Sequence, residues 1–167
     1  SKIFNSKYAA ILNISSDHLD RHGNLKNYVS AKFKLLENQN KGSVGFLNKN
    51  DKLIQNKIKK TSYKSNIKNI DFKINKVFKK KITNKYFLSK TNQENLSFVL
   101  EIIKNFHIKK DILIKSINKF KGLDYRQQII YKSKKLLIIN DSKSTSFSST
   151  VPLLESYKNI YWILGGL

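Results

Sequence analysis

The stretch YAAILNISSDHLDRHGNLKNYVSAK, residues 8–32, decides the fold class of this chain. Its first part, residues 8–14, is a short apolar run of the kind found in parallel strands that are buried on both faces. A polar turn follows over 15–23, and apolar residues then recur at helical spacing behind Asn24, a preferred N-cap residue. A buried strand, a turn and a helix in this order predict an α/β fold with a mainly parallel sheet.

The rest of the chain continues this alternation of strands and helices. We expect strands over 42–47 and 160–164 and a hairpin over 127–140. We expect helices over 51–59, 92–106, 111–120 and 152–157. The helix over 111–120 should begin at an acidic N-cap. The lysine-rich segment KVFKKKITNKYF, residues 76–87, is typical of a strand or hairpin because it mixes aromatic and β-branched residues. On the helix 92–106, the apolar stripe that we expect to be buried consists of Leu96, Val99, Leu100, Ile103 and Phe106.

The pattern changes near Gly122, and this change predicts a domain boundary. We expect residues 1–122 to complete one domain and residues 123–167 to begin another. The chain has 167 residues and no methionine, which favours a piece of a longer protein. No apolar run approaches the roughly 20 residues that a membrane helix needs, so we expect no membrane association.

The composition excludes several classes of site and leaves one class of partner open. The chain has no cysteine, so disulfides, thiol nucleophiles and cysteine-based metal sites are excluded. Its net charge of +22 could serve a nucleic-acid interface. However, only Arg21 and Arg126 are arginines, and the lysines are spread along the whole chain. We therefore favour a solvated basic surface over a nucleic-acid groove, which remains the alternative.

The polar turn after the first strand is the first candidate site. It contains Asp17, His18, Asp20 and His22 just past the carboxyl end of a buried strand, where open α/β sheets bind ligands. These side chains could ligate a metal or act as acid and base, although zinc lacks an apparent third ligand. The alternative is a turn that only caps the following helix.

Lys32 is the second candidate, because it lies next to the apolar stripe of the helix that follows the turn. A lysine at such a position usually extends its charged end into water. The functional alternative is a partly desolvated amine whose lowered pKa makes it reactive.

Two further candidates follow the predicted boundary. If the strand that ends in KLLIIN stays extended, then Asp141, Lys143 and Thr145 point the same way and present an acceptor, a cation and a hydroxyl to a nucleotide. The alternative is a capping segment for the next helix. Arg126 stands in GLDYR, and its planar guanidinium would suit a bidentate contact to phosphate.

These motifs, in this order, resemble those of the Mur ligases. The segment NISSDHLDRHGNLKNYVSAK, residues 13–32, is similar to the signature N-I-S-P-D-H-L-D-R-H-G…Y…A-K. GLDYRQQ, residues 122–128, resembles G-L-x-H-R, and INDSKSTS, residues 139–146, resembles N-D-S-K-A-T-N. TNQEN, residues 91–95, stands where the family has H-N-x-x-N. Sister ligases of the family differ at the motif that INDSKSTS resembles, and the match here is to the member that uses D-glutamate.

The resemblance implies an ATP-dependent amide ligase that joins D-glutamate to UDP-N-acetylmuramoyl-L-alanine through an acyl phosphate. It implies a cytoplasmic, monomeric enzyme of peptidoglycan precursor synthesis that uses ATP and Mg²⁺, with an incomplete central domain and the start of a Rossmann-like domain. A sister ligase that adds another amino acid is the alternative. The implied residue roles are a carbamylated, metal-binding Lys32, His18 near Mg²⁺ and the acyl group, Asn95 at adenine, Arg126 and Lys143 at phosphate, Asp141 at ribose, and Thr145 at D-glutamate.

The chain also departs from the family pattern. Ser16 replaces a proline, Tyr125 a histidine and Ser146 an asparagine, while Thr91 replaces a histidine whose role is not carried over. No glycine is followed by Lys-Ser or Lys-Thr, so the phosphate loop is absent from this sequence. We expect that loop in an upstream segment, and we expect the 167 residues alone to be inactive.

Overall fold

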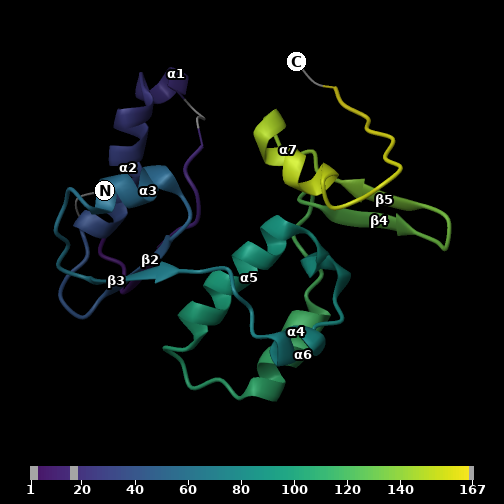
Figure 1. The fold of residues 1–167 in the computed structure, drawn as a ribbon, viewed down its shortest axis with the longest axis horizontal. Coiled ribbons are helices and arrows are strands. Elements are labelled where there is room, and N and C mark those ends of the chain that lie inside the picture. Colours follow the sequence, from purple (N-terminus) through teal and green to yellow (C-terminus); the bar gives the residue numbers. More distant parts are fainter. Residues whose placement is uncertain (1–3, 16–18, 166–167) are drawn as a thin grey trace. The chain divides into compact units, whose positions relative to one another are not determined.

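The computed structural model describes residues 4–15 and 19–165 and divides the chain into two compact units. The first unit comprises Ser1–Lys73 and Ser97–His107, and the second comprises Ile74–Leu96 and Ile108–Leu167. Strands and helices alternate in the first unit, as the order of elements in Figure 1 shows. The expected α/β class is therefore confirmed, and the domain boundary near Gly122 stays a prediction.

The first unit is built on a parallel sheet of strands β1 (Tyr8–Ile11), β2 (Val44–Asn48) and β3 (Asn66–Ile70), in that order. Ala10 pairs with Phe46, and Phe46 pairs with Lys68 on the other side. All three strands therefore end at the same edge. This arrangement confirms the parallel sheet that the apolar runs predict.

Two helices of the first unit begin at side-chain caps, and the sequence predicts the first of these caps, Asn24. Helix α1 (Leu19–His22) is one turn long, α2 spans Leu25–Glu37 and α3 spans Lys52–Ile58. Asn24 Oδ1 accepts a hydrogen bond from Asn27 N at 2.9 Å at the start of α2. Asp51 Oδ1 accepts one from Ile54 N at 3.0 Å at the start of α3. Each cap satisfies an amide that the first turn of a helix leaves unpaired.

Both faces of the parallel sheet are buried, because successive side chains of a strand point to opposite faces. On one face, the fully buried Phe33 and Leu36 of α2 and Ile54 of α3 pack on the sheet with Ile11 and Leu47. On the other face, the second half of helix α5 (Lys90–Ile103) contributes the buried Phe98, together with Phe46 and Ile70 and the half-buried Ile102. The unit is therefore a sheet between two helical layers.

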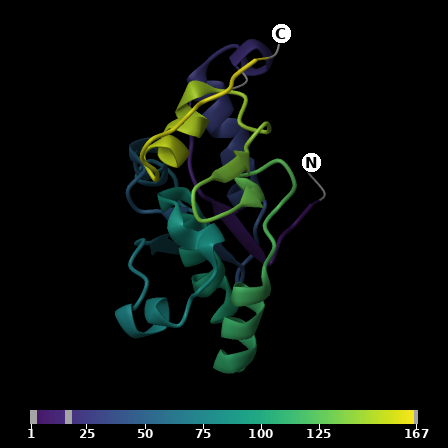
Figure 2. The same ribbon diagram turned by 90° about the vertical axis from the view of Figure 1, so that its right-hand side faces the viewer.

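The second unit contains helices and one antiparallel hairpin. Its elements are α4 (Lys76–Lys80), the 3₁₀ helix η1 (Lys85–Leu88), the first half of α5, α6 (Lys110–Lys119), β4 (Gln128–Lys132), β5 (Leu137–Asn140) and α7 (Phe147–Leu154). Strands β4 and β5 pair antiparallel, which confirms the hairpin expected over 127–140. Figure 2 shows this hairpin and α7 from a second direction.

The expectation of a strand or hairpin over 76–87 is wrong, because this segment forms α4 and η1. Two asparagines explain the difference. Asn75 Oδ1 accepts hydrogen bonds from Val77 N and Phe78 N and starts α4. Asn84 Oδ1 accepts one from Tyr86 N, while Asn84 Nδ2 donates to carbonyls at the end of α6. Caps and a tertiary contact thus override the β preference of the segment.

The expected closing strand over 160–164 is also wrong, because these residues have no regular structure. Tyr161 is 97% exposed and Ile163 is 94% exposed. A strand requires a neighbouring strand to pair with, and the hairpin β4–β5 has no third strand among the described residues.

Smaller differences concern the helices. Within the stripe expected on α5, Leu96 is buried, but Val99 and Phe106 are exposed, and Phe98 packs on the sheet instead. Helix α6 has Lys109 as its N-cap, with Asp111 in its first turn. Helix α7 begins at Phe147, earlier than expected, because Ser146 and Ser149 form a capping box ahead of it.

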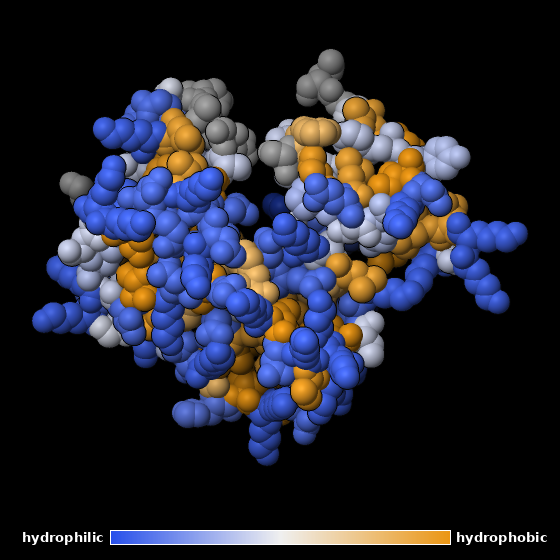
Figure 3. Space-filling model, viewed as in Figure 1, coloured by the Kyte–Doolittle hydropathy of each residue, from blue (hydrophilic) through white to orange (hydrophobic). Residues whose placement is uncertain are grey.

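The lysines give the molecule a hydrophilic surface. Hydrophilic side chains cover most of the face drawn in Figure 3, and they are spread over many elements rather than gathered on one. Among the described residues, no helix has both the length and the apolar character that crossing a bilayer requires.

Candidate functional site

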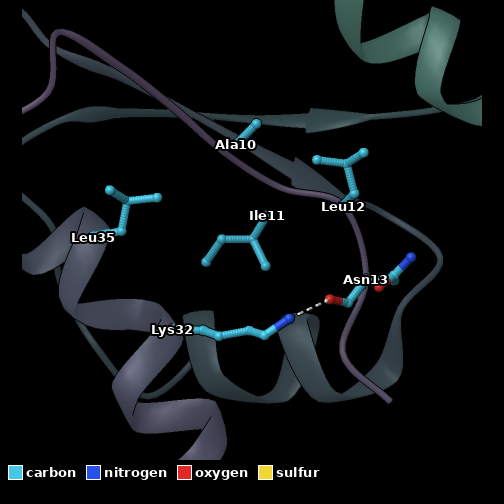
Figure 4. A pocket seen from close by; sticks show the side chains of 6 residues that line it. All are labelled: Ala10, Ile11, Leu12, Asn13, Lys32 and Leu35. Atoms are coloured by element: carbon cyan, nitrogen blue, oxygen red, sulfur yellow. Dashed lines mark hydrogen bonds between the residues drawn. The ribbon is translucent and has the colours of Figure 1, made fainter. Parts of the chain in front are cut away.

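The candidate residues of the first unit lie at the carboxyl end of β1. Lys32 reaches from α2 towards Asn13, the second residue after β1, as Figure 4 shows. Lys32 Nζ lies 3.5 Å from Asn13 O and 4.8 Å from the ring centroid of Tyr28. This amine lines a pocket of about 370 Å³ whose walls are Ala10, Ile11, Leu12, Asn13, Lys32 and Leu35.

The surroundings of Lys32 combine an apolar wall with a single carbonyl. Among the described residues, no carboxylate lies within ion-pair distance of its ammonium. Lys32 is half-buried and ends at the pocket instead of extending freely into water. An amine in this position can be reached by small molecules that enter the pocket. A functional role of Lys32 stays a prediction.

A network of amide side chains joins the carboxyl ends of all three strands. Asn48, the last residue of β2, donates from Nδ2 to Leu12 O at 2.9 Å. Gln55 Nε2 donates to Asn48 O and to Asn69 Oδ1 on β3, at 2.9 Å each. The sheet edge that carries the pocket is therefore cross-linked by hydrogen bonds from α3.

Asp51 fixes the loop that follows β1. Its Oδ2 atom accepts a hydrogen bond from Ile14 N at 2.8 Å, while its Oδ1 atom caps α3. The sequence predicts a helix near Asp51, but it does not predict this second contact. The polar residues 48–51 follow the strand expected over 42–47, and this position could have indicated that they contact the carboxyl edge of the sheet.

The polar turn is only partly described. Ser16, Asp17 and His18 lie outside the described residues, so the predictions for His18 remain predictions. The His22 ring lies 5.1 Å from the Tyr28 ring, and His22 O accepts a hydrogen bond from Asn27 Nδ2 at 3.1 Å. His22 therefore packs against α2.

The described residues do not by themselves make a metal site. No group of three or more His, Cys, Asp or Glu side chains in the described part of the chain is placed to hold a metal ion. Lys32 is a cation unless it is modified, and Mg²⁺ takes oxygen ligands.

The second unit brings three of the motifs together through Gln127. Its side-chain oxygen Oε1 accepts hydrogen bonds from Ser89 Oγ at 2.7 Å and from Asn92 Nδ2 at 2.8 Å, at the start of α5. Its backbone N donates to Asp141 Oδ1 at 2.9 Å. TNQEN, GLDYRQQ and INDSKSTS therefore meet at one residue, although the sequence singled out neither Gln127 nor Asn92. Asn92 lies within TNQEN and Gln127 within GLDYRQQ, and this membership is the signal that could have found them.

The segment after β5 turns instead of staying extended. Asn140 Oδ1 accepts a hydrogen bond from Ser142 N at 3.0 Å, and Asp141 O accepts one from Ser144 N at 2.9 Å. The alignment of Asp141, Lys143 and Thr145 along a strand is therefore wrong, because side-chain and backbone hydrogen bonds close a turn directly after the strand.

The turn holds the carboxylate and leaves the other two side chains exposed. Ser144 Oγ donates to Asp141 Oδ2 at 2.7 Å, so both oxygens of Asp141 have protein donors. Lys143 N donates to Tyr125 O, and Lys143 Nζ lies 6.0 Å from the Tyr125 ring centroid. The Lys143 and Thr145 side chains are exposed.

Tyr86 is in electrostatic contact with two of the predicted nucleotide-binding residues. Burial raises the pKa of its phenol, the Arg126 guanidinium lowers the pKa, and the Asp141 carboxylate raises it. Arg126 directly precedes Gln127, whose backbone N donates to Asp141 Oδ1, so Arg126 and Asp141 lie in the same part of the second unit. Asn95 stands one turn after Asn92 on α5 and is half-buried.

The predicted site residues thus fall into two sets. Lys32 belongs to the first unit, and Asn95, Arg126, Asp141, Lys143 and Thr145 belong to the second. The second set places a guanidinium, a carboxylate and an exposed lysine around one hydrogen-bonded loop. Such a set can bind an anionic ligand that also carries hydroxyl groups.

The described fold is that of an α/β protein with a pocket and polar side chains at the carboxyl edge of a parallel sheet. A family model described as "Mur ligase middle domain" matches residues 1–113. The chain belongs to the Mur ligase family. Its fold is similar to the crystal structure of MurF from Acinetobacter baumannii, with a TM-score of 0.73 and 17% identity over 93% of this chain and 38% of that chain.

Curated relatives are similar over almost the whole sequence. The chain is 29% identical over 186 residues to a UDP-N-acetylmuramoylalanine–D-glutamate ligase of Rickettsia bellii, which covers 99% of the chain and 41% of the relative. It is 32% identical over 171 residues to the ligase of the same name from the Wolbachia of Brugia malayi. That alignment covers 95% of the chain and 34% of the relative. The chain therefore spans well under half the length of these relatives.

Proposed function

We propose that this chain is part of an ATP-dependent ligase that joins D-glutamate to UDP-N-acetylmuramoyl-L-alanine in peptidoglycan precursor synthesis. The observation that carries the proposal is the meeting of three motifs of the second unit at Gln127 and Asp141. The names of the curated relatives, which are similar over 99% and 95% of the chain, support this choice of substrates. We further propose a monomeric, cytoplasmic enzyme whose central domain ends near Gly122.

The residues of the second unit suit a nucleotide. Arg126 and Lys143 would contact its phosphates, because a guanidinium and an ammonium neutralise phosphate charge. Asp141 would accept hydrogen bonds from ribose hydroxyls, and Asn95 would bind the adenine. Thr145, exposed after the turn, would hold D-glutamate.

In the first unit, Lys32 and His18 would act at the acyl end of the substrate, where the amide bond forms. A carbamate on Lys32 would supply the hard oxygens that Mg²⁺ requires, with His18 close to the second ion. The pocket beside Lys32 has room for such an addition. Magnesium would neutralise phosphate charge when bound.

The chemistry needs two steps because a carboxylate is a poor electrophile. The substrate carboxylate first accepts the γ-phosphoryl group of ATP, and ADP leaves. The amine of D-glutamate then attacks the acyl carbon, loses a proton and displaces phosphate. The products are the amide, ADP and phosphate, so all atoms are accounted for.

The test uses the complete protein encoded by the gene that contains this sequence. Phosphate release should require ATP, the muramoyl-alanine nucleotide and D-glutamate together. Release that does not depend on D-glutamate would reject the proposal. Competition among amino acids in the same assay separates this ligase from a sister ligase, which the likeness to MurF leaves as an alternative.

The second candidate is a nucleic-acid binder, which the net charge of +22 favours. Such a protein would be retained on duplex or single-stranded DNA at physiological ionic strength, with affinity falling steeply as salt rises. The ligase proposal expects no such retention. The spread of the lysines along the whole chain supports the ligase proposal over a basic groove.

A further inference from the structure

We propose that Gln127 is a positioning residue that sets the geometry of Arg126 and Asp141 in the nucleotide site. This inference rests on the proposed function. Gln127 directly follows Arg126 in the chain and contacts Asp141 through its backbone N at 2.9 Å. Its side chain points to a different segment, the start of α5. One residue therefore links three parts of the second unit.

The side chain of Gln127 works as an acceptor. Its partners, Ser89 Oγ and Asn92 Nδ2, are both donors, and Ser89 and Asn92 are only 2% and 4% exposed. Asn92 Nδ2 also donates to the backbone carbonyl Tyr86 O at 2.8 Å, so the same amide holds the end of the 3₁₀ helix η1 as well. Removing the Gln127 oxygen would leave two buried donors without this partner, which is costly.

The backbone of Gln127 adds a second constraint. Its φ of 47° and the φ of 64° at Tyr125 are left-handed values, which non-glycine residues seldom adopt without help from surrounding contacts. These two residues flank Arg126, so the direction of the Arg126 side chain depends on both. The hydrogen bonds of Gln127 are the contacts that hold one side of this loop in place.

Asp141 is held between two donors. Gln127 N reaches Oδ1, and Ser144 Oγ reaches Oδ2 at 2.7 Å. A shift of Gln127 would therefore rotate or release the carboxylate that we assign to ribose. The expected consequence is weaker nucleotide binding with less effect on the chemical step.

The test is steady-state kinetics of the complete ligase with Gln127→Met, which keeps the length of the side chain but has no acceptor oxygen. We expect the KM for ATP to rise about tenfold or more, with a smaller change in kcat. Gln127→Glu keeps an acceptor oxygen and should bring the KM back towards that of the parent protein. Gln93→Met is the matched control on the same helix, because the side chain of Gln93 accepts a hydrogen bond from Lys79 Nζ and donates one to Leu88 O.

A double-mutant cycle distinguishes positioning from a structural role. If Gln127 acts through Arg126 and Asp141, Gln127→Met should add little to the loss in ATP affinity caused by Arg126→Gln and Asp141→Asn together. If the two losses multiply, or if the KM stays unchanged while only stability falls, the assignment is overturned.

A second variant covers the case in which Gln127→Met does not fold. Gln127→Asn tolerates the left-handed backbone better, yet its shorter side chain cannot place an oxygen between Ser89 and Asn92. It should show the same rise in KM, and an unchanged KM would overturn the assignment. A parent protein without ATP-dependent ligation would instead overturn the proposed function, and this inference with it.

Discussion

The carboxylate of Asp51 accepts a hydrogen bond from the backbone amide of Ile14, 37 residues earlier in the chain, at an N···Oδ2 distance of 2.8 Å. The other carboxylate oxygen caps helix α3 at Ile54 N. A single side chain therefore starts a helix and fixes the loop that leads from β1 into the polar turn. Ile14 is buried, so its amide would lack a partner without Asp51.

The first prediction concerns this double contact. Asp51→Ala should lower the free energy of unfolding by about 2 kcal/mol, because it removes an N-cap and leaves a buried amide unpaired. Urea unfolding followed by circular dichroism measures the change. Asp71→Ala is the control, since its ion pairs with Lys49 and Lys73 are exposed and contribute little. Equal effects of the two variants would contradict the role given to Asp51.

The second prediction concerns Gly122, whose φ is +82° and whose added Cβ would lie 2.7 Å from Cε2 of Tyr86. Gly122→Ala should therefore destabilise the fold through both backbone strain and a clash with a rigid ring. Gly42→Ala is a matched control, because Gly42 has a φ of +84° and nothing within 4 Å of the added Cβ.

We expect Gly42→Ala to cost about 1 kcal/mol, from the left-handed backbone alone. The Gly122→Ala cost should exceed it by about 1–3 kcal/mol, the range for overpacking. Thermal or urea unfolding compares the two variants. If both lose the same stability, then Tyr86 does not pack against Gly122 as described.

The third prediction concerns the titration of Tyr86. Burial raises the pKa of its phenol above the usual value near 10. Because the folded state holds the proton more tightly than the unfolded state, the contribution of Tyr86 to stability is present below pH 10 and is lost as the pH rises through the folded-state pKa. Tyr86→Phe should weaken the loss of stability in this alkaline range.

Two charged neighbours of Tyr86 shift its pKa in opposite directions, so removing each of them can be measured separately. The Arg126 guanidinium lowers the pKa of Tyr86 and the Asp141 carboxylate raises it. Absorbance titration near 295 nm should therefore show a higher pKa in Arg126→Gln and a lower pKa in Asp141→Asn. Shifts in the opposite directions would show that these charges do not face the phenol. Tyr63 and Tyr157, whose pKa values burial also raises, are removed by substitution with Phe to isolate the signal.

The fourth prediction concerns Lys32 in the complete ligase. Lys32→Ala should abolish turnover, and short carboxylic acids should restore part of it by supplying the oxygens of the expected carbamate. Lys34→Ala is the control, because Lys34 is an exposed lysine on the same helix. A Lys32→Ala enzyme with full activity, or a loss that no acid restores, would mean that the amine has no metal-binding role.

Much of the first unit was predictable from local patterns. Strand β1 lies within the apolar run 8–14, the helix behind Asn24 follows from apolar periodicity and its cap, and the helix over 52–58 lies within the predicted 51–59. The hairpin β4–β5 follows from two β-rich runs with a short polar break. These features depend on residues that are neighbours in the chain, so sequence spacing carries them.

The candidate sites were predictable only as residue types. Motif resemblance singled out Lys32, Arg126 and Asp141, and the structure places Lys32 at a pocket and the other two near Tyr86. Asn92 and Gln127 were missed, because an amide side chain can donate or accept and its partner cannot be chosen from spacing alone. Their functional roles stay predictions.

By itself, the sequence determined the α/β class, the helix starts at Asn24 and Asp51, and the family that the motifs indicate. Only the tertiary structure decided that 76–87 forms α4 and η1, that 160–164 pairs with no strand among the described residues, and that Gln127 connects α5 to Asp141. The physical reason is that caps and periodicity act within one or two turns of chain. Strand pairing and side-chain hydrogen bonds instead depend on which distant segments the folded chain brings within about 3 Å.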